Sequence, residues 1–529
     1  MRPAGAPTEQ PSAMRGSATV ATWTLVSRVT GLGRIIVVGA VLGPTYLANC
    51  FVATNTVPNM VYLAMAGSVL SAIVVPPIVR AVKSDGDRAA TDLIGRLAGY
   101  LLFIGALGSI ALALISPLVA HLLTFDIADD ANRARGHTVT QLMVLFVAPQ
   151  VVFYLIATLG AAAQQARGRF ALAAAAPAAE NVGVMVTIVV AGAMFGRGLD
   201  IDSAGLSLTL VLCVGSTVSV ALHMALQLAG AARVGLPVRP SRRFCTDPVT
   251  REVTARLRRS LVVAASPYAA YLSLIVMAGT VPGGVLVLQM AYAVYSLPLA
   301  LGGRAVSTAV LPGLSHAATN GDRCAFSAKL REGLVYGAGA GLPPLLFLVV
   351  FAYPVADFLA NGRMRVGSLI AVLATCLVVL AFAQLAAGLK EVAVNGLFAG
   401  LNIRGPQIAA LLNLAITLGA GLVSTALLSG PSRLVGLSAT ILMADLAAAA
   451  AAILLAHRMI RPGRVIDAGR LALLGWASAA MLPALLAGGY AVHALHANRF
   501  AELAVAGASG LVAVGCYALP LRAKAEVAS

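Results

Sequence analysis

The amino-acid sequence predicts an all-α protein that crosses a membrane many times. Of its 529 residues, 59% are hydrophobic and only 11% carry a charge, whereas soluble domains are roughly 45–50% apolar and about 25% charged. The apolar residues form runs of about 20 or more, which is the length that a helix needs to cross the hydrocarbon core. Because unpaired backbone groups are costly in lipid, such runs fold as helices.

Polar or turn-forming residues separate fourteen predicted spans, several of them longer than a perpendicular crossing requires. The spans cover residues 17–43, 46–80, 92–122, 138–164, 171–195, 203–231, 260–281, 284–316, 328–359, 367–396, 405–429, 433–457, 469–490 and 500–521. The predicted organisation is a tail, a six-helix lobe, a basic linker, a second six-helix lobe, two C-terminal helices and a second tail. These parts cover residues 1–16, 17–231, 232–259, 260–457, 458–521 and 522–529.

The net charge of +17 reflects membrane topology. In a soluble protein it would suggest nucleic acid, but here the basic residues lie in short loops, and no nucleic-acid partner is expected. With the N-terminus in the cytoplasm, 26 of the 37 Lys and Arg residues fall on the cytoplasmic side and 7 on the outer side. This asymmetry satisfies the positive-inside rule, and an even number of spans places both termini in the cytoplasm.

The two lobes are predicted to be repeats of one another. Residues 67–76 (GSVLSAIVVP) resemble residues 303–312 (GRAVSTAVLP), and each stretch lies near the end of the second span of its lobe. Six spans is an even number, so the repeats would be parallel, related by an axis along the membrane normal. Ordinary helix packing through small residues is the alternative explanation. The linker holds eight arginines between Arg233 and Arg259, and its second half is either a basic amphipathic helix or a plain connector.

Two arginines within the first span need an explanation. Arg28 and Arg34 lie about 16 Å and 25 Å along the helix from Ser17, too deep for easy contact with the interface. A buried guanidinium is costly unless it faces water, a partner or a ligand. We interpret both as part of a cationic cavity that holds an anion, most simply phosphate, by bidentate hydrogen bonds. Pairing with buried carbonyls or carboxylates is the alternative.

Two further basic residues lie within predicted spans. Arg304 follows Gly302 and Gly303 in the eighth span, where it faces either the same central space or the inner interface. Lys390 precedes Glu391 late in the tenth span. Adjacent residues do not share a helix face, so these two need not neutralise each other. Lys390 is either functional or reaches the nearby cytoplasmic surface.

Acidic and amide side chains within the spans are few. Glu180 and Asn181 follow Pro177 in the fifth span, Asn413 is the expected counterpart in the second lobe, and Glu391 and Asp445 are the other acids. These residues are candidates for an ion-coupling site or for interhelical hydrogen bonds. The cysteines and histidines show no metal-ligand spacing, and no nucleotide or catalytic motif is present, so no metal, cofactor or catalytic residue is expected.

Four stretches of the sequence resemble one known family. They are residues 27–34 (SRVTGLGR), 55–76 with its Val57-Pro58-Asn59 motif, 291–315 and 395–406. The sequence is similar in these stretches to the MviN/MurJ family of lipid II flippases, within the multidrug/oligosaccharidyl-lipid/polysaccharide exporter superfamily. Fourteen spans is also the number in that family.

The resemblance implies a flippase that moves an undecaprenyl-diphosphate-linked peptidoglycan precursor across the bacterial plasma membrane for cell-wall synthesis. It implies alternating access of two lobes around a cationic cavity, driven by Na⁺, H⁺ or the membrane potential, and a groove for the lipid tail at spans thirteen and fourteen. Arg28 and Arg34 match two cavity arginines of the family, and Asn49 and Asn59 join the candidate polar residues. Membrane lipids and cell-wall synthesis proteins are the implied partners.

The sequence also departs from the family pattern. Asn49, Tyr62, Leu63, Gly67 and Ala293 stand where charged residues are common in the family. Part of the usual anion site is therefore missing, which leaves other readings open. The chain could carry another polysaccharide or glycolipid precursor, export cationic drugs in exchange for a cation, or act as a non-transporting paralogue in an envelope complex. The exporter reading requires buried carboxylates, which are scarce here.

Overall fold

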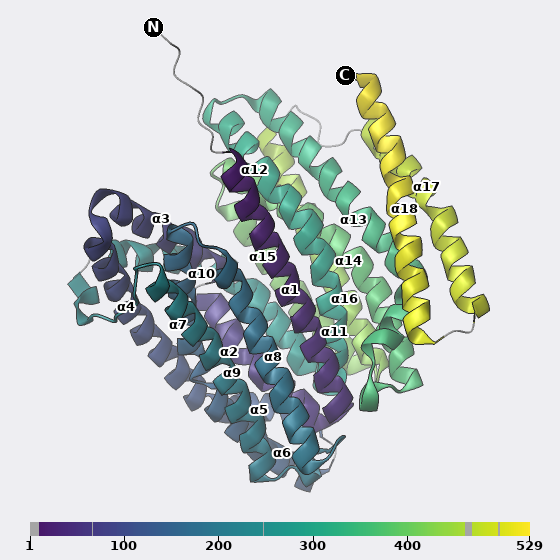
Figure 1. The fold of residues 1–529 in the computed structure, drawn as a ribbon. Coiled ribbons are helices and arrows are strands. Elements are labelled where there is room, and N and C mark those ends of the chain that lie inside the picture. The colour runs from purple at the N-terminus through teal and green to yellow at the C-terminus, as the bar shows by residue number, and fades with distance from the viewer. Residues whose placement is uncertain are drawn as a thin grey trace. The chain divides into compact units, whose positions relative to one another are not determined.

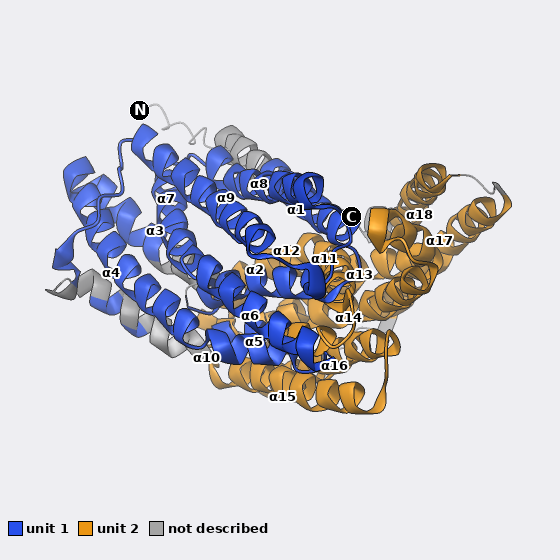
Figure 2. Cartoon of the chain, turned by 90° about the horizontal axis from the view of Figure 1, so that it is seen from below, with its two compact units in different colours: residues 1–268 blue, residues 269–529 orange. Residues whose placement is uncertain are grey.

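In the computed structural model of the chain, helices joined by turns and loops make up the described residues (Figure 1). These are residues 10–65, 67–127, 129–246, 248–460, 468–495 and 498–528, and none of them lies in a strand. The predicted all-α membrane fold is confirmed. The chain divides into two compact units, residues 1–268 and 269–529 (blue and orange in Figure 2), and the division falls within α10 (Pro248–Ala278).

Unit 1 is built around α8 (Ala171–Phe195), which packs between α1 (Gln10–Leu42) and α9 (Leu206–Arg233). On its other side, α9 packs against α7 (Gln150–Ala166). The remaining helices of this unit are α2 (Tyr46–Met65), α3 (Gly67–Ser84), α4 (Gly86–Leu114), α5 (Ser116–Thr124), α6 (Asp130–Val147), η1 (Ile201–Ser203) and η2 (Arg242–Thr246).

Small residues bring the central helices of unit 1 together. A Cβ atom added to Gly183 of α8 would lie 2.5 Å from the Ser219 hydroxyl of α9. A Cβ added to Gly160 of α7 would lie 2.8 Å from the Gln227 carbonyl oxygen. In lipid, close approach through such residues replaces the hydrophobic driving force that operates in water. The helices that carry the candidate polar residues are thereby held in close contact.

Unit 2 has α14 (Gly367–Ala399) at its centre, in contact with α13 (Arg323–Leu359), α16 (Ser432–Ile460), α11 (Gly284–Pro298) and α12 (Arg304–Thr319). A π-helical turn, η3 (Leu299–Gly303), follows Pro298 and leads directly to Arg304. The unit also contains η4 (Gly362–Met364), α15 (Arg404–Leu427), α17 (Ala468–Leu495) and α18 (Arg499–Ala528).

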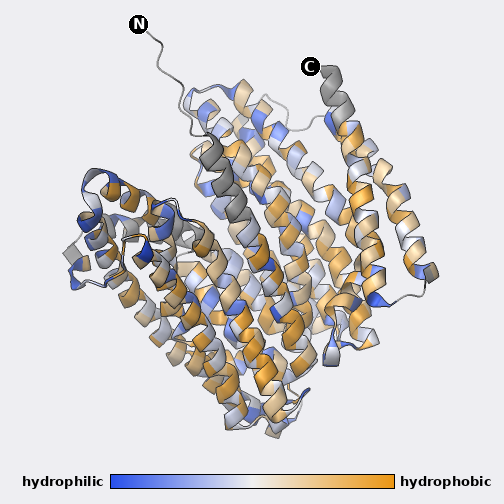
Figure 3. Cartoon of the chain, viewed as in Figure 1, coloured by the Kyte–Doolittle hydropathy of each residue, from blue (hydrophilic) through white to orange (hydrophobic). Residues whose placement is uncertain are grey.

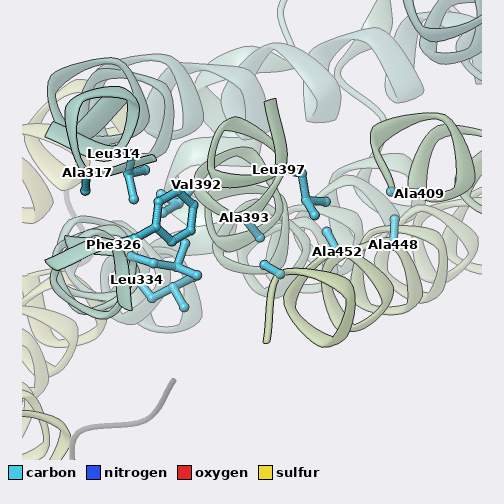
Figure 4. Close-up of a cluster of buried hydrophobic side chains, with 12 residues drawn as sticks. Leu314, Ala317, Phe326, Leu334, Val392, Ala393, Leu397, Ala409, Ala448 and Ala452 are labelled. Atoms are coloured by element: carbon cyan, nitrogen blue, oxygen red, sulfur yellow. The ribbon is translucent and has the colours of Figure 1, made fainter. Parts of the chain in front are cut away.

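A buried apolar cluster joins α12 to α16 within unit 2 (Figure 4). Phe326 and Leu330 of α13 pack with Val392 of α14, and alanines fill the contact between α14 and α16. Ala393, Ala448 and Ala452 are fully or almost fully buried, so these two helices approach each other closely. This contact fixes the position of Lys390, which lies three residues before Ala393 on α14.

In the described part of the chain, twelve helices are long and apolar enough to cross a membrane. Apolar residues run along these helices in Figure 3. The twelve correspond one by one to twelve of the fourteen predicted spans. The segment 46–80 forms two helices, α2 and α3, and the segment 260–281 contributes the shorter apolar helix Ala264–Ala278. The number fourteen therefore stays a prediction.

Several predicted boundaries differ from those in the structure. Helix α1 begins at Gln10, seven residues before the expected Ser17, so part of the predicted tail is helical. The second half of the predicted linker belongs to α10, which continues into the apolar segment. The described residues leave out residues 1–9, 66, 128, 247, 461–467, 496–497 and 529. Parts of the predicted tails, second span, linker and C-terminal region fall on them.

Candidate functional site

The two arginines of α1 differ in their surroundings. Arg28 is exposed, and no hydrogen bond or ion pair joins it to another residue in the described part of the chain. Arg34 is partly exposed, with 35% of its side chain accessible, and its Nη1 lies 3.9 Å from Oε1 of Glu180. That distance allows electrostatic attraction but exceeds the 2.7–3.2 Å of a hydrogen bond. Arg34 therefore keeps donors for a further partner.

Glu180 is the centre of a buried polar cluster in unit 1. Its Oε1 accepts a hydrogen bond of 2.8 Å from the Tyr154 hydroxyl, and its Oε2 lies 2.8 Å from Nδ1 of His223. All three side chains are at least nine-tenths buried. The partners come from α7, α8 and α9, and Arg34 adds a fourth helix. A buried carboxylate is tolerated when it is paired and hydrogen-bonded in this way.

The predicted amide residues of unit 1 take structural positions. Asn181 donates to the Ser27 carbonyl oxygen at 3.2 Å and to the Thr30 hydroxyl at 3.3 Å, so it ties α8 to α1 beside Arg28. Asn59 of α2 is half-buried and interacts with the Tyr154 hydroxyl. Asn49 is buried in α2, with 2% of the residue exposed. The Asn181 contacts match the interhelical alternative considered above.

A second buried cluster surrounds Asp445 in unit 2. Lys390 Nζ donates to Oδ1 at 2.6 Å, Asn413 Nδ2 donates to the same oxygen at 3.2 Å, and the Tyr295 hydroxyl donates to Oδ2 at 2.7 Å. Four helices meet here as well: α11, α14, α15 and α16. Lys390 therefore does not need to reach the membrane surface, because it has a carboxylate partner within the unit.

Arg304 lies at the start of α12 and pairs with Glu391 of α14. Its Nε lies 3.4 Å from Oε1, with 56% of the Arg304 side chain and 31% of the Glu391 side chain exposed. The Glu391 carbonyl oxygen accepts from Ser307, which also receives a hydrogen bond from Asn395. Lys390 and Glu391 thus face different partners, as their adjacent positions on one helix lead us to expect.

The two clusters share one chemical pattern. Each has a buried carboxylate, a tyrosine hydroxyl that donates to it and a basic side chain beside it. Glu180 is the tenth residue of α8, which begins at Ala171, and Asn413 is the tenth residue of α15, which begins at Arg404. The basic partners differ, because unit 1 uses histidine with arginine and unit 2 uses lysine.

Sequence reasoning missed Tyr154, His223 and Tyr295, and counted Asp445 only among the intramembrane acids. No local signal could have identified the three aromatic residues, since their partners lie 26, 43 and 150 residues away on other helices. In the described residues, no group of three or more His, Cys, Asp or Glu side chains could hold a metal ion.

Comparison with known proteins decides the family. Residues 38–504, most of the chain, match the model of the family described as "Lipid II flippase MurJ". The chain belongs to this family. It is therefore a multi-pass inner-membrane protein of a transporter family, as the motifs of the sequence predict. The match begins after Arg28 and Arg34, so the roles of these two residues must be argued from their own surroundings.

Curated relatives carry the same family name. The chain is 24% identical to a Haemophilus influenzae protein over 341 residues. The matched region covers 63% of this chain and 65% of that protein. It is 25% identical to the lipid II flippase MurJ of Burkholderia cenocepacia, over 66% of each chain. A Rhizobium meliloti relative is 26% identical over 78% of this chain and 75% of its own length. The first two matches span just under two thirds of those relatives.

Solved structures show the same fold. A structure titled "Lipid II flippase MurJ, inward closed conformation" has a TM-score of 0.68 and 14% identity, and the likeness covers 95% of this chain and 99% of that one. An inward-facing multidrug resistance MATE family transporter of the MOP superfamily has a TM-score of 0.63 and 15% identity, over 84% and 98% of the two chains. At such identities the likeness concerns the fold alone.

Proposed function

We propose that this protein moves lipid II, an undecaprenyl-diphosphate-linked peptidoglycan precursor, across the plasma membrane by alternating access. The observation that carries the proposal is the pair of arginines on α1 in a chain whose family is that of the lipid II flippases. Arg28 is exposed without a described protein partner, and Arg34 keeps donors beyond its long contact with Glu180. Both side chains are suited to a diphosphate, because guanidinium groups bind phosphate oxygens in bidentate geometry.

The charges explain why such a site helps the headgroup to cross. A diphosphate in an apolar medium would carry a large desolvation penalty, which fixed positive charges offset in a region of low dielectric constant. The apolar tail stays in lipid and needs no such compensation. Arg304 of unit 2 is a further proposed phosphate ligand, with 56% of its side chain exposed beside Glu391. The protein carries out no chemistry on the substrate in this scheme.

The cellular setting follows from the same proposal. Both termini lie in the cytoplasm in this scheme, which the excess of basic residues in the loops assigned to that side supports. The energy comes from the membrane potential or from a gradient of H⁺ or Na⁺, and cell-wall synthesis proteins are the natural neighbours of a chain that delivers their substrate. Asn49, Asn59, Asn181 and Asn413 supply polar contacts within the units in this scheme.

Cation-coupled drug export is the weaker alternative, although its fold is similar. An exporter of organic cations needs a buried carboxylate that is available to the drug. In the described part of the chain, the buried acids Glu180 and Asp445 already face basic side chains of their own unit. Arg28, which has no partner in that part of the chain, attracts anions instead.

Depletion and complementation test the proposal. In cells depleted of their own flippase, the wild-type chain should restore export of lipid II in a leaflet-specific assay, and the double variant Arg28→Ala/Arg34→Ala should fail. The variant Arg28→Lys/Arg34→Lys should retain part of the activity because it keeps the charge but loses the bidentate geometry. Arg363→Ala is the matched control, since Arg363 is exposed in the short turn η4.

Two outcomes would contradict the proposal. Full complementation by the double alanine variant would exclude the arginines as the anion site. Failure of the wild-type chain to restore lipid II export, together with restored export of another glycan, would favour a different lipid-linked precursor.

A further inference from the structure

The cluster around Glu180 contains a titratable pair that anion binding alone does not require. His223 lies 2.8 Å from Glu180, both side chains are about nine-tenths buried, and Arg34 lies 3.9 Å from the same carboxylate. The Tyr154 hydroxyl already donates to Glu180. A carboxylate serving only to hold Arg34 would be expected to bond with it directly, yet its two short contacts are with tyrosine and histidine.

The groups that face His223 come from three helices. Glu180 belongs to α8, Tyr154 belongs to α7 and contacts the imidazole edge-on at 6.3 Å between ring centroids, and Arg34 of α1 stands on the far side of Glu180. Tyr62 of α2 stacks on Tyr154 and bonds to Thr158.

Charged and titratable residues of α6 point elsewhere. Arg133, Arg135 and His137 bond to the backbone carbonyl oxygens of Ile127, Ala204 and Pro117, near the beginning of α9 and away from His223. Glu180 and Arg34 are therefore the charged side chains of the described part of unit 1 that act on His223.

Histidine is the side chain whose charge changes most readily near neutral pH. With neutral His223, Nδ1–H donates to Glu180, and the carboxylate balances the charge of Arg34. When Nε2 of His223 takes up a proton from water, the ring becomes an imidazolium. Its positive charge then balances the Glu180 carboxylate at Oε2, the oxygen that does not face Arg34. The neutralised carboxylate then attracts Arg34 less strongly, so the charge of Arg34 becomes more available to an anion. No atom needs to move for this change. The Glu180–His223–Arg34 group changes from a net charge of zero to +1.

We propose that His223 and Glu180 form a proton-binding site that couples protonation to anion binding at Arg34. This inference rests on the proposed function, because it takes a lipid diphosphate as the anion at Arg34. Linkage is reciprocal: if a proton strengthens diphosphate binding by some factor, bound diphosphate strengthens proton binding by the same factor. The flippase then takes up one proton with each diphosphate and releases it when the diphosphate leaves.

Unit 2 provides an internal comparison. Its cluster also has a carboxylate and a tyrosine, but the base is Lys390, which makes a direct 2.6 Å hydrogen bond to Asp445. That ammonium holds the carboxylate directly. Of the two clusters, that of unit 1 has a base able to change its charge, and it lies beside the arginine proposed to bind substrate.

Proton counting tests the coupling. Full-length protein in nanodiscs is titrated with farnesyl diphosphate between pH 5.5 and pH 8.5, in buffers of different ionisation enthalpy. The number of protons taken up per diphosphate is obtained for the wild type and for His223→Gln, whose amide can still donate to Glu180. The probe's own protonation is common to both proteins and cancels in the difference.

Between pH 5.5 and pH 8.5 the wild type should take up as much as about one proton more per diphosphate than His223→Gln. Its affinity should also fall more steeply with rising pH, by up to about tenfold per pH unit relative to the variant. Glu180→Gln removes the carboxylate through which His223 acts on Arg34, so its proton uptake should match that of His223→Gln. His137→Gln makes the same substitution at a histidine of α6 that contacts the Pro117 carbonyl oxygen, so it should retain the extra proton and is the matched control.

The results separate the two proposals. Equal proton uptake by the wild type and His223→Gln, with the diphosphate still bound, overturns the coupling and leaves the anion site standing. Absence of binding to the wild type at every pH overturns the anion site and the coupling together. Melting temperatures of the variants establish that they are folded, and loss of the extra proton in folded His137→Gln also contradicts the inference.

Discussion

The ion pair between Lys390 and Asp445 should contribute strongly to the stability of unit 2. The two charged atoms lie 2.6 Å apart, with 23% of the lysine and 4% of the aspartate side chain exposed. At an effective dielectric constant of about 20, unit charges at that distance attract by roughly 6 kcal/mol. Removing one member of a buried pair typically costs about 3–5 kcal/mol. Because Tyr295 and Asn413 still donate to Asp445 in Lys390→Met, we expect a loss near the lower limit, about 3 kcal/mol.

A double-mutant cycle measures this contribution. The free energy of unfolding is obtained for Lys390→Met, Asp445→Asn and the double variant from SDS titration in mixed micelles, followed by circular dichroism. The double variant should be more stable than the sum of the single losses predicts, since it leaves no unpaired buried charge. The Arg304–Glu391 pair is the control, because its exposure should keep its coupling below about 1 kcal/mol. A loss below 1 kcal/mol in Lys390→Met, or additive losses, would refute the reasoning.

Two glycine contacts provide further predictions. Replacing Gly99 of α4 by valine should displace the segment that ends at Ser241, because the new side chain would collide with the Ser241 carbonyl oxygen. Trypsin should then cleave faster after the exposed Arg243. The control Gly475→Val, whose added side chain meets open space, should show no change in cleavage. Replacing Gly183 by leucine should force α8 away from Ser219 of α9 and cost about 1–3 kcal/mol in unfolding free energy, whereas Gly507→Leu, with no atom near its added Cβ, should be neutral. Unchanged proteolysis or unchanged stability would show that the neighbouring backbone yields easily.

The sequence predicts the helices well because lipid imposes one simple requirement on each of them. A run of apolar residues must satisfy its own backbone hydrogen bonds, so hydropathy alone places α8 at 171–195, as expected. The boundaries are predicted less well. Helix α1 begins at Gln10 and not at the expected Ser17, because polar residues at the end of a helix carry no hydropathy signal.

The polar contacts could be predicted only in part. The sequence places Lys390 and Glu391 on different faces of one helix, and the structure gives them different partners. It could not identify those partners, because spacing along one helix says nothing about which residues of another helix stand opposite. Tyr295 and Asp445 are 150 residues apart, and packing of the whole unit brings them together.

Acids are scarce in the spans, but whether a basic residue has an acidic partner must be asked for each one separately. Arg34, Arg304 and Lys390 each face a carboxylate of their own unit. Arg28 has no such partner in the described part of the chain, so its charge must be balanced by water, lipid or substrate. On the proposed function, the loss of Arg28 removes a contact with the diphosphate and leaves the buried acids unaffected, whereas the loss of Arg34 also removes a positive charge that faces Glu180. Arg28→Ala should reduce flipping at unchanged unfolding free energy, and Arg34→Ala should reduce both; equal stability losses in the two variants would show that Arg28 also has a structural partner.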